Sequence, residues 1–278
     1  MAGVALGNTR QISRRPFRAP FLFGGTMEDT AFLLPGERLD EVNDKIRLIQ
    51  KPDGLTFGTD ALLLAGFVRG EKDSAVLELG GGSGIISLLL LGRDKCRTCH
   101  VAEIQEDYVD LCRRNATLNG MEERFFPLRA DVRDLSTLPG AERFDRVVSN
   151  PPYMAVGHGP ENGHTPKNIA RREVMGDIRA FCRAAAYSLR WGGTFSVVYR
   201  AGRAVDLLCA MRESGIEPKR LTPVMAETDR DPVLLLAEGK KGGHPDLTFT
   251  RPLYLYKSGT REYSPEMETI LETGSFPF

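Results

Sequence analysis

Short apolar runs alternate with helical patterns along the chain from about residue 45 onward. Runs rich in valine, leucine, isoleucine and phenylalanine, bounded by glycine, proline or charged residues, predict buried strands. The predicted strands are Ala75–Leu79, Cys99–Ile104, Phe126–Ala130, Phe144–Ser149, Thr194–Tyr199, Val233–Ala237 and Leu253–Tyr256. The predicted helices are Asp60–Val68, Gly84–Leu91, Asp107–Asn119, Ile178–Leu189 and Ala204–Ser214. Strands that alternate with helices indicate a doubly wound α/β sheet.

The end of the chain breaks this alternation. Two strand-like runs, Val233–Ala237 and Leu253–Tyr256, follow one another with no helix-sized segment between them. A parallel sheet closed by an antiparallel hairpin has this pattern. We therefore expect a Rossmann-like, seven-stranded, mostly parallel sheet with an antiparallel C-terminal hairpin.

A glycine cluster follows the first predicted strand. The strand ends in the acid Glu78 and the leucine after it, and Gly80, Gly82 and Gly84 then stand at alternate positions before a helix. Glycines permit a tight turn and let the backbone approach a ligand closely. The spacing is G-x-G-x-G, and Ile85 stands where the dinucleotide motif G-x-G-x-x-G has its last glycine. A plain strand–helix turn stays open as an alternative at this point.

Acids also stand at the ends of the next two predicted strands. Glu103 ends the second strand, where a carboxylate can accept both ribose hydroxyls of a nucleoside cofactor. Asp131 follows the third strand, where a carboxylate can accept an adenine amino group. One such acid is most often a solvated cap. Three at successive strand ends beside a glycine turn are similar to the first three motifs of class I methyltransferases.

The fourth predicted strand leads into Asn150-Pro151-Pro152-Tyr153. This resembles the N-P-P-Y motif of amino-group methyltransferases. The lone pair of an exocyclic amine is delocalised into the ring, so the amine is a poor nucleophile. Accepting its two N–H bonds, on the Asn150 side-chain carbonyl and the Pro151 backbone carbonyl, localises the lone pair, and the prolines preorganise the loop. Tyr153 can stack on a base withdrawn from its neighbours.

Composition and charge place limits on the rest. The chain is 41% apolar and 27% charged, with 37 basic and 37 acidic side chains, which is ordinary for a globular protein. Five cysteines, an odd number, and no apolar run near the ~18 residues of a membrane span favour a cytoplasmic protein without a membrane partner. We expect residues 1–32 to be a flexible extension and residues 33–278 to form the domain, with no metal site.

Positive charge gathers after the proline loop. The segment from residue 165 to residue 203 holds only two acids, Glu173 and Asp177. Its eight basic side chains are Lys167, Arg171, Arg172, Arg179, Arg183, Arg190, Arg200 and Arg203. Phosphates of an RNA docked at the loop would fall here, so we expect Lys167, Arg171 and Arg172 to bind RNA. A solvated helix face with no such function has the same composition.

Several segments resemble one narrower family, the tRNA1(Val) adenine-N6 methyltransferases. They are Lys51–Ala65, the run that begins at Glu103, Arg113–Asn115, Asn168–Glu173 and the closing Arg251–Tyr256 with Glu262–Ser264. The resemblance implies S-adenosylmethionine as cofactor and the N6 amino group of an adenosine next to the tRNA anticodon as acceptor. It also implies that Thr59, Asp60 and Asn150 lie near the cofactor. Arg172 stands where the family has histidine, and Glu78 where aspartate is commoner.

Three other functions remain open on the sequence. A protein-glutamine N5-methyltransferase uses the same loop chemistry on an amide, although few residues precede the first strand for its helical substrate domain. A non-catalytic RNA-binding protein on the same fold is the second, disfavoured by the intact Asn150 and acids. A nicotinamide oxidoreductase is the third, disfavoured by the glycine spacing.

Overall fold

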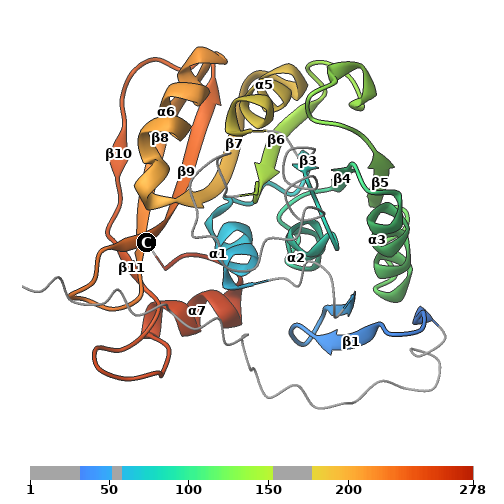
Figure 1. Ribbon diagram of the computed structural model, residues 1–278, viewed down its shortest axis with the longest axis horizontal. Helices are drawn as coiled ribbons and strands as arrows, with labels where there is room; N and C mark the ends of the chain where they lie inside the picture. The colour runs from blue at the N-terminus through green and yellow to red at the C-terminus, as the bar shows by residue number, and fades with distance from the viewer. Residues whose placement is uncertain (1–31, 52–57, 153–176, 278) are drawn as a thin grey trace, which may run out of the picture.

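The computed structural model describes residues 32–51, 58–152 and 177–277. Its strands are β1 (Arg38–Glu41), β2 (Arg47–Gln50), β3 (Ala75–Leu79), β4 (Thr98–Glu103), β5 (Phe125–Arg129), β6 (Phe144–Ser149), β7 (Leu189–Arg200), β8 (Ile216–Met225), β9 (Pro232–Lys241), β10 (Thr248–Phe249) and β11 (Leu253–Tyr254). Its helices are α1 (Thr59–Phe67), α2 (Ile85–Gly92), α3 (Glu106–Leu118), α5 (Ile178–Ser188), α6 (Ala204–Glu213) and α7 (Pro265–Thr273), with single 3₁₀ turns at Leu135–Thr137 and Ala201–Arg203. Figure 1 shows these elements around one central sheet.

The central sheet has the order β10-β8-β9-β7-β6-β3-β4-β5, with β11 also paired to β8. The strands from β5 to β7 pair in parallel, and β9 runs antiparallel between β7 and β8. The predicted α/β fold with a mostly parallel sheet and an antiparallel hairpin near its end is confirmed. Seven of the strands are long, as expected, and two-residue strands β10 and β11 extend the edge.

The hairpin is made by a strand that the sequence analysis missed. Its strands are β8 and β9, whereas Leu253–Tyr254 is the short β11 and pairs with β8 in parallel. The assignment of Leu253–Tyr256 to the hairpin is therefore wrong. Two prolines, Pro218 and Pro223, hide β8 from a propensity argument because proline cannot donate to a ladder. The ladder tolerates Pro218 at a register shift beside it.

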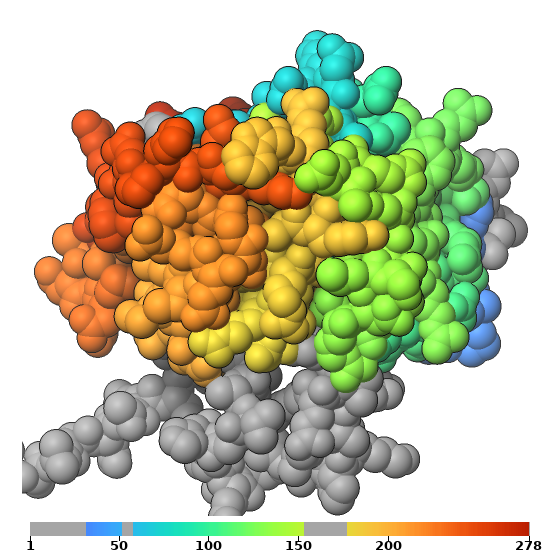
Figure 2. Space-filling model, turned by 90° about the horizontal axis from the view of Figure 1, so that it is seen from above, coloured from blue at the N-terminus to red at the C-terminus, as the bar shows by residue number. Residues whose placement is uncertain are grey.

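Two hydrophobic clusters cover the two faces of the sheet. On one face α1, α2 and α7 pack on residues such as Val76 and Val148, and on the other α5 and α6 pack on Leu77 and Val147. Helix α2 is apolar on nearly all sides, because it is buried between the sheet and α1. Figure 2 looks onto the second face. The orange, yellow and green parts of the chain lie side by side there, in the order of the sheet.

Helix α1 is oriented by cations at its C-terminal end. Its last carbonyls, which have no partner within the helix, accept hydrogen bonds from two buried side chains. Lys95 donates to the carbonyls of Ala65, Gly66 and Val68, and Arg220 donates to that of Phe67. Lys95 lies just before β4, at the amino edge of the parallel strands. The N-terminal end of α1 therefore lies toward their carboxyl edge.

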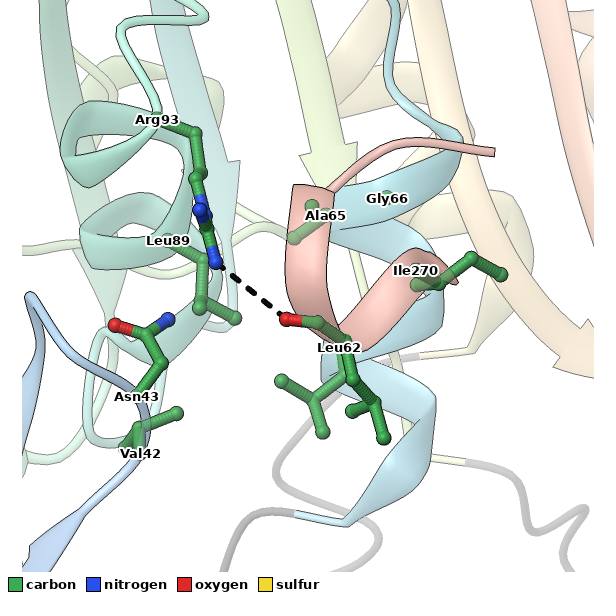
Figure 3. A pocket seen from close by; sticks show the side chains of 10 residues that line it. Val42, Asn43, Leu62, Ala65, Gly66, Leu89, Arg93 and Ile270 are labelled. Atoms are coloured by element: carbon green, nitrogen blue, oxygen red, sulfur yellow. Dashed lines mark hydrogen bonds between the residues drawn. The ribbon is translucent and has the colours of Figure 1, made fainter. Parts of the chain in front are cut away.

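An apolar cavity of about 210 Å³ lies among α1, α2, α7 and the β1–β2 turn. Figure 3 shows Leu62, Leu89 and Ile270 in its wall, with Arg93 donating to the Leu271 carbonyl at 3.4 Å. None of the predicted site residues lines it. The candidate site lies instead at the carboxyl edge of the sheet.

Candidate functional site

The glycine turn and the proline loop leave the sheet side by side. Strands β3 and β6 are parallel neighbours, and Leu79 is paired with Ser149 at their carboxyl ends. The Ser149 hydroxyl donates to the Leu79 carbonyl at 2.8 Å and fixes this register. The next residues of the two strands are Gly80 and Asn150. The fold thus brings together two motifs that are far apart in the sequence, as open parallel sheets do where they bind ligands.

The glycine turn needs glycines for backbone reasons. Gly80, Gly82 and Gly84 have φ values of +70°, +55° and +79°, in the left-handed region that side chains with a Cβ rarely adopt. The Gly80 amide donates to the Ala102 carbonyl at 2.8 Å, which ties the turn to β4. At Gly82 a Cβ would meet no atom within 4 Å, so this part of the turn borders open space. A ligand can approach the backbone there.

Gly81 is a fourth required glycine, which the sequence analysis did not single out. A Cβ at Gly81 would lie 2.1 Å from Val101 Cγ1, whereas its φ is not in the left-handed region. The constraint is therefore packing against β4 and not backbone conformation. Only the tertiary structure shows it, because Val101 belongs to the next strand.

Gly81→Ala is expected to destabilise the protein by ~1–3 kcal/mol, as overpacked cores do. Val101→Ala in the same chain should restore part of that loss, which a double-mutant cycle measured by denaturant unfolding would show. Gly82→Ala, with open space around its Cβ, should cost only ~1–2 kcal/mol for left-handed backbone and should weaken ligand binding at the turn. Additive effects of Gly81→Ala and Val101→Ala would contradict this account.

Glu103 is buried against the glycine turn. It is 2% exposed, and its carboxylate accepts hydrogen bonds from the Gly82 amide at 2.9 Å and from the Gln105 amide at 3.0 Å. Each oxygen is thus used once and keeps acceptor capacity. The two amides hold the carboxylate in one orientation at the end of β4. This fits the predicted role of a rigid acceptor for a pair of vicinal hydroxyls.

Glu78 lies beneath the turn. It is 1% exposed, and one carboxylate oxygen accepts from the Ser87 amide at 3.0 Å and the Ser87 hydroxyl at 2.5 Å. These contacts join the end of β3 to the first half of α2. Burial raises the pKa of Glu78 to about 7 from its ordinary value of 4.5. Glu78 therefore positions the turn, and its predicted contact with the cofactor stays a prediction.

The raised pKa of Glu78 predicts a pH dependence of stability. The folded protein keeps a proton that the unfolded chain has lost above pH 4.5, so stability falls as pH rises toward and through 7. Between pH 6 and pH 8 the wild type should lose ~1.4 kcal/mol of unfolding free energy relative to Glu78→Gln, which carries no titrating proton. Urea unfolding of both proteins across this range measures the difference. Parallel pH profiles of the two proteins would refute it.

Asp131 is engaged by an arginine two residues along the chain. Arg133 donates to both carboxylate oxygens, at 2.9 Å from Nε and 2.6 Å from Nη2, and its backbone amide donates as well. The Arg133 hydrogen bonds lower the pKa of Asp131, so the carboxylate stays ionised. A ligand amino group at Asp131 must share it with Arg133 or displace that exposed side chain.

The proline loop is described only in its first part. Pro151 is buried and Pro152 half-buried, directly after Asn150. Tyr153, Lys167, Arg171 and Arg172 lie outside the described residues. The predicted catalytic role of Tyr153 and the predicted RNA-binding role of the three basic residues therefore stay predictions.

Thr59 and Asp60 form the first turn of α1, at the end of the helix that points to the carboxyl edge. Their predicted place near the cofactor is compatible with this orientation. Asn115, which is fully buried in α3, links the N-terminal strands to the same edge. Its side chain donates to the Ser83 carbonyl at 3.0 Å and exchanges hydrogen bonds with the backbone of Ile49 in β2. This positioning role was not predicted from the sequence.

The basic side chains after the loop are dispersed. Arg190 opens β7 at the amino edge and pairs with Asp145 at 2.6 Å, and Arg179 pairs with Glu213. Arg203 pairs with Asp206. Part of the local surplus is thus neutralised and part lies far from the loop. Within the described ranges no three His, Cys, Asp or Glu side chains gather as a metal site. No helix in those ranges is both long and apolar enough to cross a membrane.

Comparisons with known proteins give the family and the fold. The family model described as "Methyltransferase small domain" matches residues 52–209. The chain is 27% identical over 224 residues to a tRNA1(Val) (adenine(37)-N6)-methyltransferase of Porphyromonas gingivalis, covering 77% of this chain and 86% of that protein. It is 29% identical over 220 residues to the protein of the same name from Tolumonas auensis, covering 77% and 87%. A crystal structure of a predicted O-methyltransferase, Atu636 from Agrobacterium tumefaciens, matches with a TM-score of 0.65 at 22% identity, covering 78% and 97%, and shows the shared fold.

Proposed function

The chain belongs to the methyltransferase small domain family, and we propose that it transfers the methyl group of S-adenosylmethionine to the N6 amino group of an adenosine in tRNA. One observation carries the proposal. The Leu79–Ser149 pair places Asn150 and the prolines next to the glycine turn. A methyl donor held at the turn and an amine held at Asn150 would therefore meet at one edge.

Among the described residues, we assign the cofactor's contacts to the glycine turn and to the acids at the strand ends. We assign the ribose hydroxyls to Glu103, the adenine amino group to Asp131, and the backbone approach to Gly80, Gly82 and Gly84. Thr59 and Asp60 would lie at the methionine end. The bound cofactor supplies a methyl group activated on a sulfonium. Gly82 has open space where a side chain would be, which supports the assignment of the turn to this ligand.

The chain's own residues prepare the acceptor. The Asn150 side chain and the Pro151 carbonyl accept the two N–H bonds of the amine, which leaves its lone pair directed away from the base. The nitrogen, held by Asn150 and Pro151, would accept the methyl group from the sulfonium through its lone pair, and the methylated amine would then release a proton to water. Because the proton leaves a cationic amine, no strong general base is needed. Tyr153 is assigned to stack on the base.

The substrate class rests on the relatives and on the sequence. The names of the relatives specify adenine 37 of tRNA1(Val), so that tRNA is the first substrate to test. We place the protein in the cytoplasm, where its five free cysteines would stay reduced. We also assign residues 33–278 to the catalytic domain and residues 1–32 to an extension.

The test is methylation of an unmodified tRNA1(Val) transcript with labelled S-adenosylmethionine, followed by nucleoside analysis. We expect N6-methyladenosine in the product. Methylation of a glutamine peptide with no methylation of any RNA would overturn the substrate class and retain the reaction type.

A further inference from the structure

A hollow of about 390 Å³ lies at the amino edge of the sheet, opposite the candidate site. It is formed by the starts of β7 and β8, the end of β9 and the turn that follows β9. Figure 2 shows the yellow start of β7 beside the deep-orange turn that follows β9. We call it the Trp191 basin, and its lining is Trp191, Gly192, Lys219, Lys240, Gly242, Gly243 and His244.

The floor of the basin is an exposed aromatic ring. Trp191 is the only tryptophan in the chain and is 73% exposed. A Cβ at Gly242 would lie 2.2 Å from Trp191 Cζ2, so the indole rests directly on the glycine backbone. Gly242, with φ of +67°, permits both the turn and this contact. The ring is thus supported on one side and open on the rest. Burial of so large an apolar group is favourable, so a ligand that covers the ring would gain free energy.

The walls of the basin are positively charged. Neither Lys219 nor Lys240 forms an ion pair within the described ranges, and Lys219 donates to the His244 carbonyl at 3.1 Å. Two acids near the basin, one on β8 and one just before β6, have other partners. Glu217 pairs with Arg212 at 3.0 Å, and Glu142 pairs with Lys241 at 3.1 Å. No acid lines the basin.

We propose that the Trp191 basin is a second RNA contact, in which an unpaired base stacks on the indole while its phosphates lie against Lys219 and Lys240. An open aromatic face between ammonium groups is the arrangement that binds single-stranded nucleic acid without reading its sequence. The proposal rests on the RNA substrate of the proposed function and adds a site remote from the chemistry. The basin would give the enzyme affinity for a part of the RNA that lies away from the methylated nucleotide.

The distance between the two sites fits one RNA. Leu189, next to the basin, is paired with Phe144 of β6, and Val197 is paired with Ser149 next to the candidate site. Phe144 and Ser149 are five strand residues apart, which is ~16 Å at ~3.3 Å per residue. That span corresponds to about five stacked nucleotides at ~3.4 Å each. One folded RNA therefore reaches both edges of the sheet.

The single tryptophan makes the test direct, because the tryptophan fluorescence of the full chain, excited selectively over its tyrosines, reports on this basin alone. Titration with a short oligouridylate and with the tRNA transcript should quench it saturably, and added salt should reverse the quenching. Trp191→Ala should weaken tRNA affinity ~10-fold, measured by filter binding, and raise KM for tRNA without changing kcat. Binding of S-adenosylmethionine alone should not change.

A charge-matched pair of variants separates the basin from net charge. Lys219→Glu with Lys240→Glu should weaken tRNA binding. The slope of log K against log salt concentration should fall by the amount that corresponds to about two phosphate contacts. Lys45→Glu with Lys72→Glu, two exposed lysines outside the basin, should have a much smaller effect. Equal losses in the two double variants would overturn the proposal.

The result can be told apart from failure of the proposed function. Methylation of tRNA with no quenching and no effect of Trp191→Ala would overturn the basin as an RNA contact and leave the reaction intact. Quenching by oligouridylate in a protein that methylates no RNA would support the basin and refute the proposed reaction. Quenching by an acidic peptide and not by RNA would overturn the basin's assignment.

Discussion

Asn150→Ala is expected to lower kcat by ~10²–10³ while the affinity for S-adenosylmethionine changes far less. The side-chain carbonyl of Asn150 is a preorganised acceptor for one N–H of the amine. Its interaction with the amine strengthens as the nitrogen becomes positive, so its loss falls on the transition state. The measurement is single-turnover methylation of tRNA with saturating cofactor, beside calorimetric titration of the cofactor.

Asn43→Ala is the matched control. Asn43 lies in the β1–β2 turn, where its side chain accepts from the amides of Lys45 and Ile46, away from the carboxyl edge. This variant should keep the wild-type rate. A wild-type rate in Asn150→Ala would mean that the proline loop is only a turn, and the proposed mechanism would fall.

Glu103→Ala is expected to weaken binding of S-adenosylmethionine by ~10–100-fold, because hydrogen bonds to a charged acceptor contribute ~1.5–3 kcal/mol. Two effects combine in this loss. The ribose hydroxyls lose their acceptor, and the Gly82 and Gln105 amides lose the carboxylate that fixes the turn. Calorimetry measures the affinity for S-adenosylmethionine. Thermal unfolding without cofactor measures how far loss of the carboxylate destabilises the folded protein.

Glu106→Ala is the control for Glu103→Ala. Glu106 begins α3, three residues further along, and its partner is Arg113 at 3.7 Å on the surface. Surface ion pairs contribute little, so cofactor affinity should stay at the wild-type value. Unchanged affinity in Glu103→Ala, or tight binding of NAD by the wild type, would refute the cofactor assignment.

The sequence predicted those helices and strands whose own residues carry a clear apolar or amphipathic pattern. Strand β3 and the second half of β6 are buried on both faces and are mostly apolar in sequence. Helix α5 carries an amphipathic pattern after its cap Asp177. Helix α7 was missed although its signals are present. Ser264 caps it by accepting from the Met267 amide at 3.0 Å, Pro265 opens it and Gly274 ends it. Strand β8 was missed for a different reason, since its prolines argue against a strand unless its partners are known.

The sequence by itself determined which chemistry the chain carries. The glycine spacing, the acids at strand ends and the order of Asn150 and its prolines after a strand follow from local backbone requirements, which each segment expresses alone. The tertiary structure decided what those residues touch. The support of Glu103 by the Gly82 amide, the burial that raises the pKa of Glu78, and the contact between Gly81 and Val101 each join residues from different elements. Electrostatics and packing act between neighbours in space, and a linear pattern does not record which strands become neighbours.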